Sequence, residues 1–183
     1  MDAKLAILLS LFACVLNSIG QAIPYWLVAS ISEAGLSASV NMGLWSVCVH
    51  SDIPGANIDK CLAQWDNRDH SVPIYIIEAG CIEIGASILM FSSTIYGVVR
   101  TVIHTPTVVY TTRESGVICI LAGIMALAGC IVFASETIAG YYYHVGFALC
   151  IVAGLISIIS GILYLLARKD TQDMQDIQFT RFA

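Results

Sequence analysis

The distribution of charged residues is the feature that most constrains this chain. No Asp, Glu, Lys or Arg occurs between Lys4 and Glu33, between Glu114 and Glu136, or between Glu136 and Arg168. A charged side chain at the centre of a helix in lipid costs about 2.5–3.5 kcal/mol. Because about 20 apolar residues cross the hydrocarbon of a bilayer, each of these gaps predicts a membrane-spanning segment.

A fourth apolar segment, at residues 74–99, contains two acids, Glu78 and Glu83. The four predicted spans are 5–27, 74–99, 115–135 and 145–167. Backbone groups in lipid must be satisfied within the segment, which favours helices, and weak alternation argues against a β-barrel. The sequence therefore predicts one four-span domain over residues 1–169, an all-α transmembrane four-helix bundle, followed by a tail at 170–183.

Composition excludes several classes of protein. The chain is 58% apolar and 11% charged, whereas soluble domains average about 45–50% and about 25%, so a soluble enzyme is not expected. The net charge of −5 argues against a nucleic-acid partner, which needs a basic face. No hydrolase, P-loop, zinc-protease or dinucleotide motif occurs, and we predict neither catalysis nor a cofactor. Only the last dozen residues have a composition typical of disorder.

The positions of Lys and Arg predict the orientation in the membrane. Six of the eight fall on one side of the predicted spans, and only Lys60 and Arg68 fall on the other. By the positive-inside rule both termini are cytoplasmic, and residues 28–73 and 136–144 form outside loops. The second loop ends in three tyrosines, 141–143, which suit the membrane interface. The alternative for the first span is a signal peptide cleaved near Ala22, although the apolar run continues beyond that residue.

The seven cysteines divide by compartment. Five lie within predicted spans, where they act as small apolar side chains; these are Cys14, Cys81, Cys119, Cys130 and Cys150. Cys48 and Cys61 share the first outside loop, in an oxidising environment that favours a disulfide between them. A Cys2His2 zinc site with His50 and His70 is the formal alternative, but thiols in such a compartment pair first.

The first outside loop also carries signs of a small antiparallel β-sheet. Residues 44–49 alternate and predict a strand, whereas Gly35 and residues 37–41 read as turn material that leads into another strand. Pro54 and Gly55 predict a turn between the two cysteines. A sheet this small is marginal alone, so we expect it to be clipped by the disulfide and to rest on the outer helix ends.

Several residues at the end of the first predicted span and in this loop together resemble a known family signature. The ordered set is Trp26, then Gly43, Leu44 and Trp45, then Cys48 and Cys61. It resembles the W–GLW–C–C signature of the claudin superfamily, which includes claudins, peripheral myelin protein 22, the epithelial membrane proteins, and the gamma subunits and regulatory proteins of calcium and AMPA channels. The resemblance covers nearly the whole chain. It implies a sheet packed over a left-handed four-helix bundle, with the tryptophans and the Gly-Leu-Trp segment anchoring the sheet.

The chain also departs from claudins. The start of the second span lacks the usual Arg, the second outside loop is shorter, and the cytoplasmic segments have no cysteine for palmitoylation. The final residues, 180–183, are not the Tyr-Val ending that PDZ scaffolds bind, which argues against such a scaffold as partner. By this resemblance, the sequence is similar to that of a divergent member of the superfamily.

Charged groups in the first outside loop are candidates for ion permeability. Five acids face two bases there, and in claudins acids near the disulfide line a paracellular passage that favours cations. The resemblance implies that Asp52 and Asp59 are the candidate residues for cation permeability in this chain. A fixed carboxylate in a narrow path concentrates cations. The alternative is a solvated loop of mixed charge, and His50 and Lys60 oppose a strongly cation-selective site.

The two acids of the second span are functional candidates because they are ionisable groups at membrane depth. Five helical residues correspond to about 7.5 Å of rise and about 140° of rotation, so Glu78 and Glu83 do not share a face. We expect Glu78 at the outer interface. Glu83 should face the bundle or a partner, with internal hydrogen bonding, partner-helix contact and an ion-related role all open.

Small residues recur at helical spacing in the last two spans, at Gly116, Gly123 and Gly129 and at Gly154, Ser157 and Gly161. Such rows allow helix backbones to approach closely in lipid. We predict close packing within the bundle, with lateral oligomer contacts as the alternative.

The predicted function follows from the resemblance. We expect a plasma-membrane protein of cell–cell contacts that assembles laterally, as a homo-oligomer or with a partner membrane protein, into an adhesive or paracellular barrier structure. The alternatives are an auxiliary subunit that modulates an ion channel or receptor, and a myelin-protein-like organiser of membranes. Membrane lipid is the other expected partner.

Overall fold

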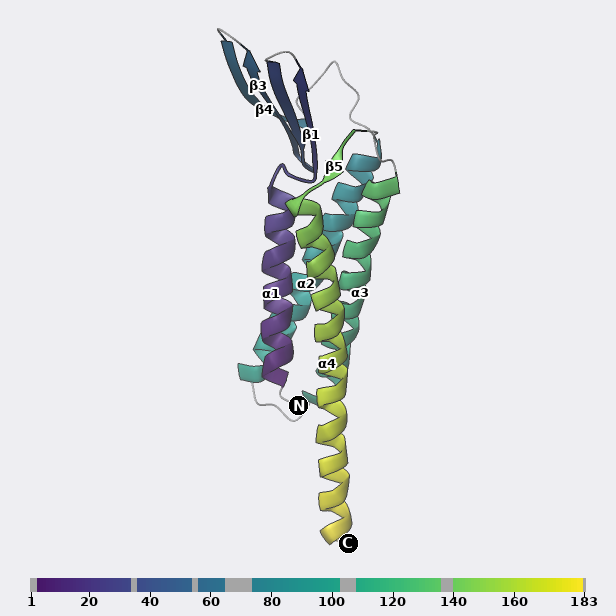
Figure 1. The fold of residues 1–183 in the computed structure, drawn as a ribbon. Helices are drawn as coiled ribbons and strands as arrows, with labels where there is room; N and C mark the ends of the chain where they lie inside the picture. The colour runs from purple at the N-terminus through teal and green to yellow at the C-terminus, as the bar shows by residue number, and fades with distance from the viewer. Residues whose placement is uncertain are drawn as a thin grey trace.

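The fold is a bundle of four long helices with a β-sheet standing at one end (Figure 1). The computed structural model describes residues 3–33, 36–53, 56–64, 74–102, 108–135 and 140–182. The helices are α1 (Ala3–Ala22), α2 (Ile74–Val102), α3 (Val108–Ser135) and α4 (Val145–Phe182). Successive helices pack against each other and α4 packs back against α1, so the bundle closes on itself.

Each helix contains a stretch long and apolar enough to cross a membrane. These stretches are Lys4–Ala22, Tyr75–Val99, Arg113–Ser135 and Val145–Ala167. Large apolar side chains such as Leu8, Phe91, Ile131 and Ile159 are exposed on the outside of the bundle, as expected where hydrocarbon is the solvent. The prediction of four long apolar helices with a small antiparallel sheet is confirmed.

Both ends of the helical prediction need correction. The first helix ends at Ala22 rather than at residue 27, because the α conformation is disfavoured before Pro24. At the other end α4 continues to Phe182, so the tail, expected to be disordered, is helical and projects beyond the bundle (Figure 1). No Gly or Pro follows Gly161, so nothing in the tail sequence breaks the helix.

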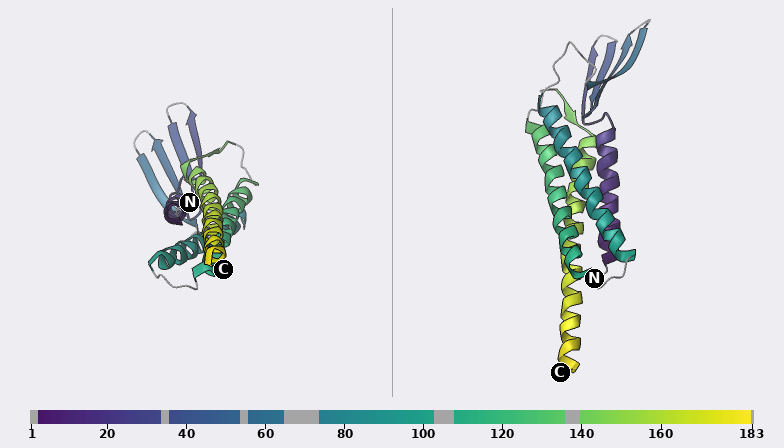
Figure 2. Two further views of the ribbon diagram at one scale, coloured as in Figure 1. Left: turned by 90° about the horizontal axis from the view of Figure 1, so that it is seen from below. Right: turned by 180° about the vertical axis from the view of Figure 1, so that it is seen from behind.

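The sheet has five antiparallel strands in the order β4-β3-β2-β1-β5. They are β1 (Leu27–Glu33), β2 (Leu36–Met42), β3 (Ser46–Ile53), β4 (Ala56–Ala63) and β5 (Tyr142–Tyr143). Figure 2 shows that the sheet leans outward on the side of α1. Residues of the predicted second outside loop thus form the edge strand β5, which the sequence did not predict.

Two predictions within the first outside loop are corrected. Residues 37–41 are not turn material but the middle of β2, where Ser37, Ser39 and Asn41 alternate with apolar residues. The strand predicted at 44–49 instead begins at Ser46 and continues to Ile53. Gly35, Pro54 and Gly55 lie outside the described residues.

The small residues of the last two spans pack α3 against α4. A Cβ added to Gly123 would lie 2.5 Å from the carbonyl oxygen of Gly154, and one added to Gly161 would lie 2.6 Å from that of Gly116. These glycines therefore serve packing within the chain. Of the five cysteines in the spans, Cys81 is exposed and the other four are buried.

Candidate functional site

The disulfide joins neighbouring strands of the sheet. Cys48 of β3 and Cys61 of β4 are directly paired in the register, and their sulfurs are bonded. Both sulfurs are thus consumed, so they are not available as ligands of the alternative zinc site, whose His70 lies outside the described residues. The bond fixes the two outermost strands on the side of the sheet away from β5.

Trp26 connects the sheet to the helices. Its side chain is completely buried and its indole N–H donates a hydrogen bond of 2.7 Å to the carbonyl oxygen of Gly20, at the end of α1. The ring centroid lies 4.8 Å from that of Phe133 in α3 and 5.9 Å from that of Phe147 in α4. Its backbone N–H donates to Met42. Trp26 therefore closes the end of the bundle beneath the sheet.

The Gly43–Trp45 segment meets the same junction. A Cβ on Gly43 would lie 2.7 Å from the Cα of Pro24, so only glycine fits there without a shift. Leu44 is buried in the cluster that contains Trp26, and the indole of Trp45 lies against Gly80 of α2. The Gln64 side chain donates to the carbonyl oxygen of Gly43 at 2.7 Å. The structure thus brings Trp26 and the Gly43–Trp45 segment together where sheet and bundle join, while the disulfide lies between β3 and β4.

The register of the sheet separates its side chains into two faces, since alternate residues point to opposite sides. We call one the polar sheet face; it carries Ser30, Ser32, Ser37, Ser39, Asn41, His50, Asp59 and the disulfide. We call the other the apolar sheet face; it carries Leu27, Ala29, Ala38, Val40, Met42, Val47, Val49, Ile58 and Leu62, and also Ser51 and Lys60, the charged side chain among the described residues of this face.

The apolar sheet face is only partly covered. Its base, Leu27 and Met42, packs into the cluster around Trp26. Farther out, Val49, Ile58 and Leu62 are 36%, 43% and 48% exposed. Antiparallel sheets usually bury one face, and contiguous exposed apolar surface marks an interaction site. Sequence reasoning missed this surface, although the period-two alternation of β2 is its signal.

The two candidate permeability acids occupy the polar sheet face by register. Asp59 is opposite His50, with 3.9 Å between a carboxylate oxygen and Nδ1, and both side chains are exposed. Asp52 lies on the same face, two residues beyond His50, but its side chain is outside the described part of the chain. Lys60 is on the apolar sheet face, so it does not oppose Asp59 directly.

Glu83 lies in a polar cluster inside the bundle, and its side chain is completely buried. The amide of Gln21 donates to the backbone oxygen of Glu83 at 3.0 Å and to the hydroxyl of Ser87 at 2.7 Å. The thiol of Cys130 donates to a carboxyl oxygen of Glu83 at 3.5 Å. The amide of Asn17 donates to Ser87 at 3.1 Å, while its oxygen has no partner among the described residues. These five residues form the Glu83 cluster.

The cluster narrows the roles open to the two acids of α2. Glu78 is exposed whereas Glu83 is buried, so they lie on different faces of the helix. Because Glu83 has no accessible surface, it does not contact a partner helix directly. Gly129 lies beside it, where an added Cβ would be 3.0 Å from a carboxyl oxygen. Internal hydrogen bonding is the role that the contacts support.

Comparison of the chain with protein-family models and with curated proteins gives no match. The geometry of the junction, the sheet faces and the Glu83 cluster therefore carries the functional argument.

Proposed function

We propose that this protein is a divergent, claudin-like protein that spans the plasma membrane four times and assembles laterally at cell–cell contacts. The assembly would form adhesion or a paracellular barrier with ion permeability. One observation carries the proposal. Trp26 and the Gly43–Trp45 segment converge where a sheet that carries the Cys48–Cys61 disulfide meets the ends of four apolar helices.

The orientation of the helices supports the predicted topology. The start of α1 and the end of α4 lie at the end of the bundle opposite the sheet (Figure 1). The positive-inside bias assigns that end to the cytoplasm, which leaves the sheet outside, where a disulfide persists. The termini are then cytoplasmic, and the sheet is presented to neighbouring proteins.

The apolar sheet face supports lateral assembly. Sheets pack face to face through apolar side chains at a spacing of about 10 Å, and the exposed Val49, Ile58 and Leu62 offer such a surface. Freeze-fracture electron microscopy tests the proposal in cells that have no intramembrane junction strands of their own and express only this protein. We expect continuous junction strands where two such cells meet.

A pair of variants locates the contact. Replacing Ile58 and Leu62 together by Ser should break up the strands, because both side chains lie on the apolar sheet face. The control Asp59→Ser changes the neighbouring residue on the polar sheet face and should leave strands intact. The proposal would be contradicted if the wild-type chain gave only scattered particles. It would also be contradicted if the two variants, at equal surface expression, formed junction strands equally well or equally poorly.

Ion permeability is tested separately. Replacing Asp52 and Asp59 together by Asn should lower the cation-to-anion permeability ratio across an expressing monolayer, because both acids occupy the polar sheet face. Lys60→Gln, on the opposite face, is the control and should leave the ratio unchanged. An unchanged ratio in the double Asn variant would remove the permeability role of these acids while leaving the barrier role in place.

One observation favours a second candidate, an auxiliary subunit of a channel or receptor. Tyr142 and Tyr143 of the second outside loop are built into the sheet as β5 and so do not form a separate contact arm toward an opposing cell. Affinity purification from native membranes discriminates the two. Stoichiometric recovery of a channel or receptor, without strands at contacts, would favour the auxiliary role.

A further inference from the structure

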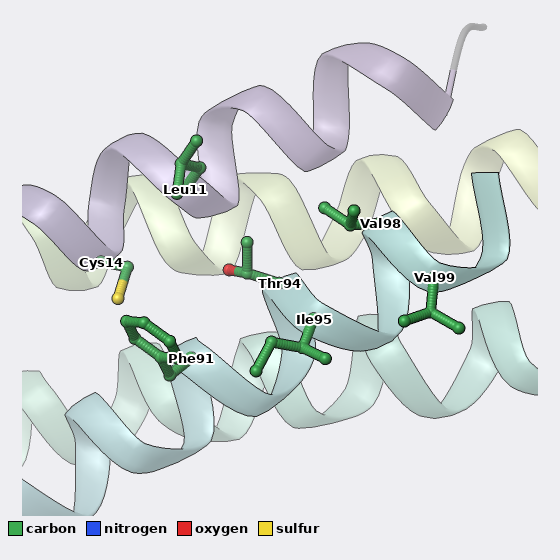
Figure 3. A pocket seen from close by; sticks show the side chains of 7 residues that line it. All are labelled: Leu11, Cys14, Phe91, Thr94, Ile95, Val98 and Val99. Atoms are coloured by element: carbon green, nitrogen blue, oxygen red, sulfur yellow. The ribbon is translucent and has the colours of Figure 1, made fainter. Parts of the chain in front are cut away.

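An apolar groove lies between α1 and α2, in the half of the bundle away from the sheet (Figure 3). Its cavity volume is about 230 Å³. Leu11 and Cys14 of α1 line it, together with Phe91, Thr94, Ile95, Val98 and Val99 of α2. Cys14 and Thr94 are buried and form its floor, whereas Leu11, Phe91 and Val98 are exposed at its rim. The groove therefore opens sideways, toward the surroundings of the bundle.

The lining of the groove offers no polar partner. The hydroxyl of Thr94 donates to the carbonyl oxygen of Met90 at 2.8 Å and lies 2.8 Å from the hydroxyl of Ser10, so it is engaged within the bundle. A buried water needs two to four polar partners, and an empty groove would lose dispersion contacts with its lining. Hydrocarbon is the occupant that this surface fits.

The end of the groove nearest the helix termini is flanked by positive charge. Lys4 is exposed in the first turn of α1, seven residues before Leu11, which corresponds to about 10 Å along the axis. A basic residue at this level attracts the anionic headgroups of the cytoplasmic leaflet, so the charge of Lys4 complements a phospholipid whose chain enters from that end.

We propose that this groove binds one acyl chain of an anionic glycerophospholipid of the cytoplasmic leaflet, with the headgroup at the end of the groove where Lys4 lies. The inference rests on the membrane topology of the proposed function, but not on assembly at cell contacts. A bound lipid would complete the contact between α1 and α2 and fix their separation.

Photo-crosslinking tests the proposal in the full-length purified chain. The protein is reconstituted into nanodiscs with phosphatidylserine or phosphatidylcholine that carries a diazirine on one acyl chain, and the labelled peptides are mapped by mass spectrometry. We expect labelling to concentrate on the lining of the groove and to be stronger with phosphatidylserine. Lys4→Gln should reduce that preference about fivefold, the effect of one basic residue near the headgroups.

Two bulky substitutions provide a matched comparison. Val98→Trp fills the groove and should abolish labelling of its lining. Val152→Trp places the same side chain at an equally exposed position of α4, since Val98 and Val152 are 44% and 45% exposed, and should leave labelling unchanged. Leu11→Trp fills the groove from α1 and replaces Val98→Trp in this comparison if that variant does not fold. Folding of each variant is checked by circular dichroism and by the intact disulfide.

Several results would overturn the proposal. These are groove labelling no stronger than labelling around Val152, equal labelling by the two lipids, or crosslinks from the groove to a second copy of the chain in place of lipid. Because nanodiscs contain no cell contacts, a chain that forms strands in cells but shows no groove labelling would refute only this inference.

Discussion

Trp26 is the residue on which the junction between sheet and bundle depends most, and its replacement makes a quantitative prediction. Its ring is completely buried between Phe133 and Phe147. Removing such a ring leaves a cavity, so Trp26→Ala should lower the free energy of unfolding by about 3–5 kcal/mol. Trp26→Phe keeps most of the ring but leaves the oxygen of Gly20 without its donor, and should cost about 1–3 kcal/mol.

A double-mutant cycle makes the prediction sharper. A Cβ added to Gly146 would lie 2.7 Å from an indole carbon of Trp26, so Gly146→Ala forces the two apart and should cost about 1–3 kcal/mol in the wild-type chain. In the Trp26→Ala background that indole is gone, so Gly146→Ala should cost clearly less. The two substitutions are therefore expected to be non-additive by about 0.5–3 kcal/mol, as is usual for residues in contact.

Equilibrium unfolding in mixed micelles, followed by near-ultraviolet circular dichroism, measures these free energies. Intact disulfide in each variant controls for a change in the unfolded state. Equal losses for the Ala and Phe variants would refute the role of ring volume. Additive effects of Trp26→Ala and Gly146→Ala would refute the contact between them.

Two further predictions use the same unfolding assay, and a third uses the rate of proteolysis. The free energy of unfolding of Glu83→Gln should stay within about 1 kcal/mol of that of the wild type. Glu83→Leu should lower it by about 1–2 kcal/mol, because this variant leaves the buried donors around it without an acceptor. The reverse order of the two variants would contradict the hydrogen-bonding role. Gly123→Ala should lower the free energy of unfolding by about 1–3 kcal/mol, since the added Cβ meets backbone atoms. The control Gly85→Ala should be nearly neutral, because its added Cβ meets only the terminal methyl of a flexible Met. Equal losses in the two variants would refute the backbone contact. Replacing Cys48 and Cys61 together by Ser opens a loop with a sequence separation of 13 residues and should destabilise the sheet by about 3 kcal/mol. We expect faster proteolysis of the sheet in this variant. An unchanged rate would show that the bundle alone holds the sheet in place.

The four helices could be predicted from the sequence because a charge in lipid is costly enough to leave long gaps in the chain. The end of α1 was less well predicted, because hydropathy does not change at Ala22; the backbone preference before Pro24 ends the helix there. The helical tail was missed because its composition is more polar and more charged than that of the spans, although it lacks Gly and Pro, which would break a helix.

The site was predictable only where one local pattern identifies it. The disulfide and the Trp and Gly-Leu-Trp residues fall in a short ordered series; the structure forms the disulfide and brings Trp26 and the Gly-Leu-Trp segment together. The Glu83 cluster joins side chains separated by 62 residues in the case of Gln21 and Glu83, and no local pattern encodes that pairing. Strand β5 was missed because a pair of tyrosines is too short to show alternation.

The hydrogen bonds around Trp26 determine how a mechanical load on the sheet would reach the helices. Its indole donates to Gly20 of α1, its backbone oxygen accepts from His144, and the oxygen of Tyr25 accepts from Gly146 at the start of α4. Tension from a neighbouring molecule would therefore be shared first by α1 and α4, which pack together along the bundle. Pulled in shear, these bonds would bear the force in parallel, so the junction would rupture cooperatively instead of peeling open one bond at a time.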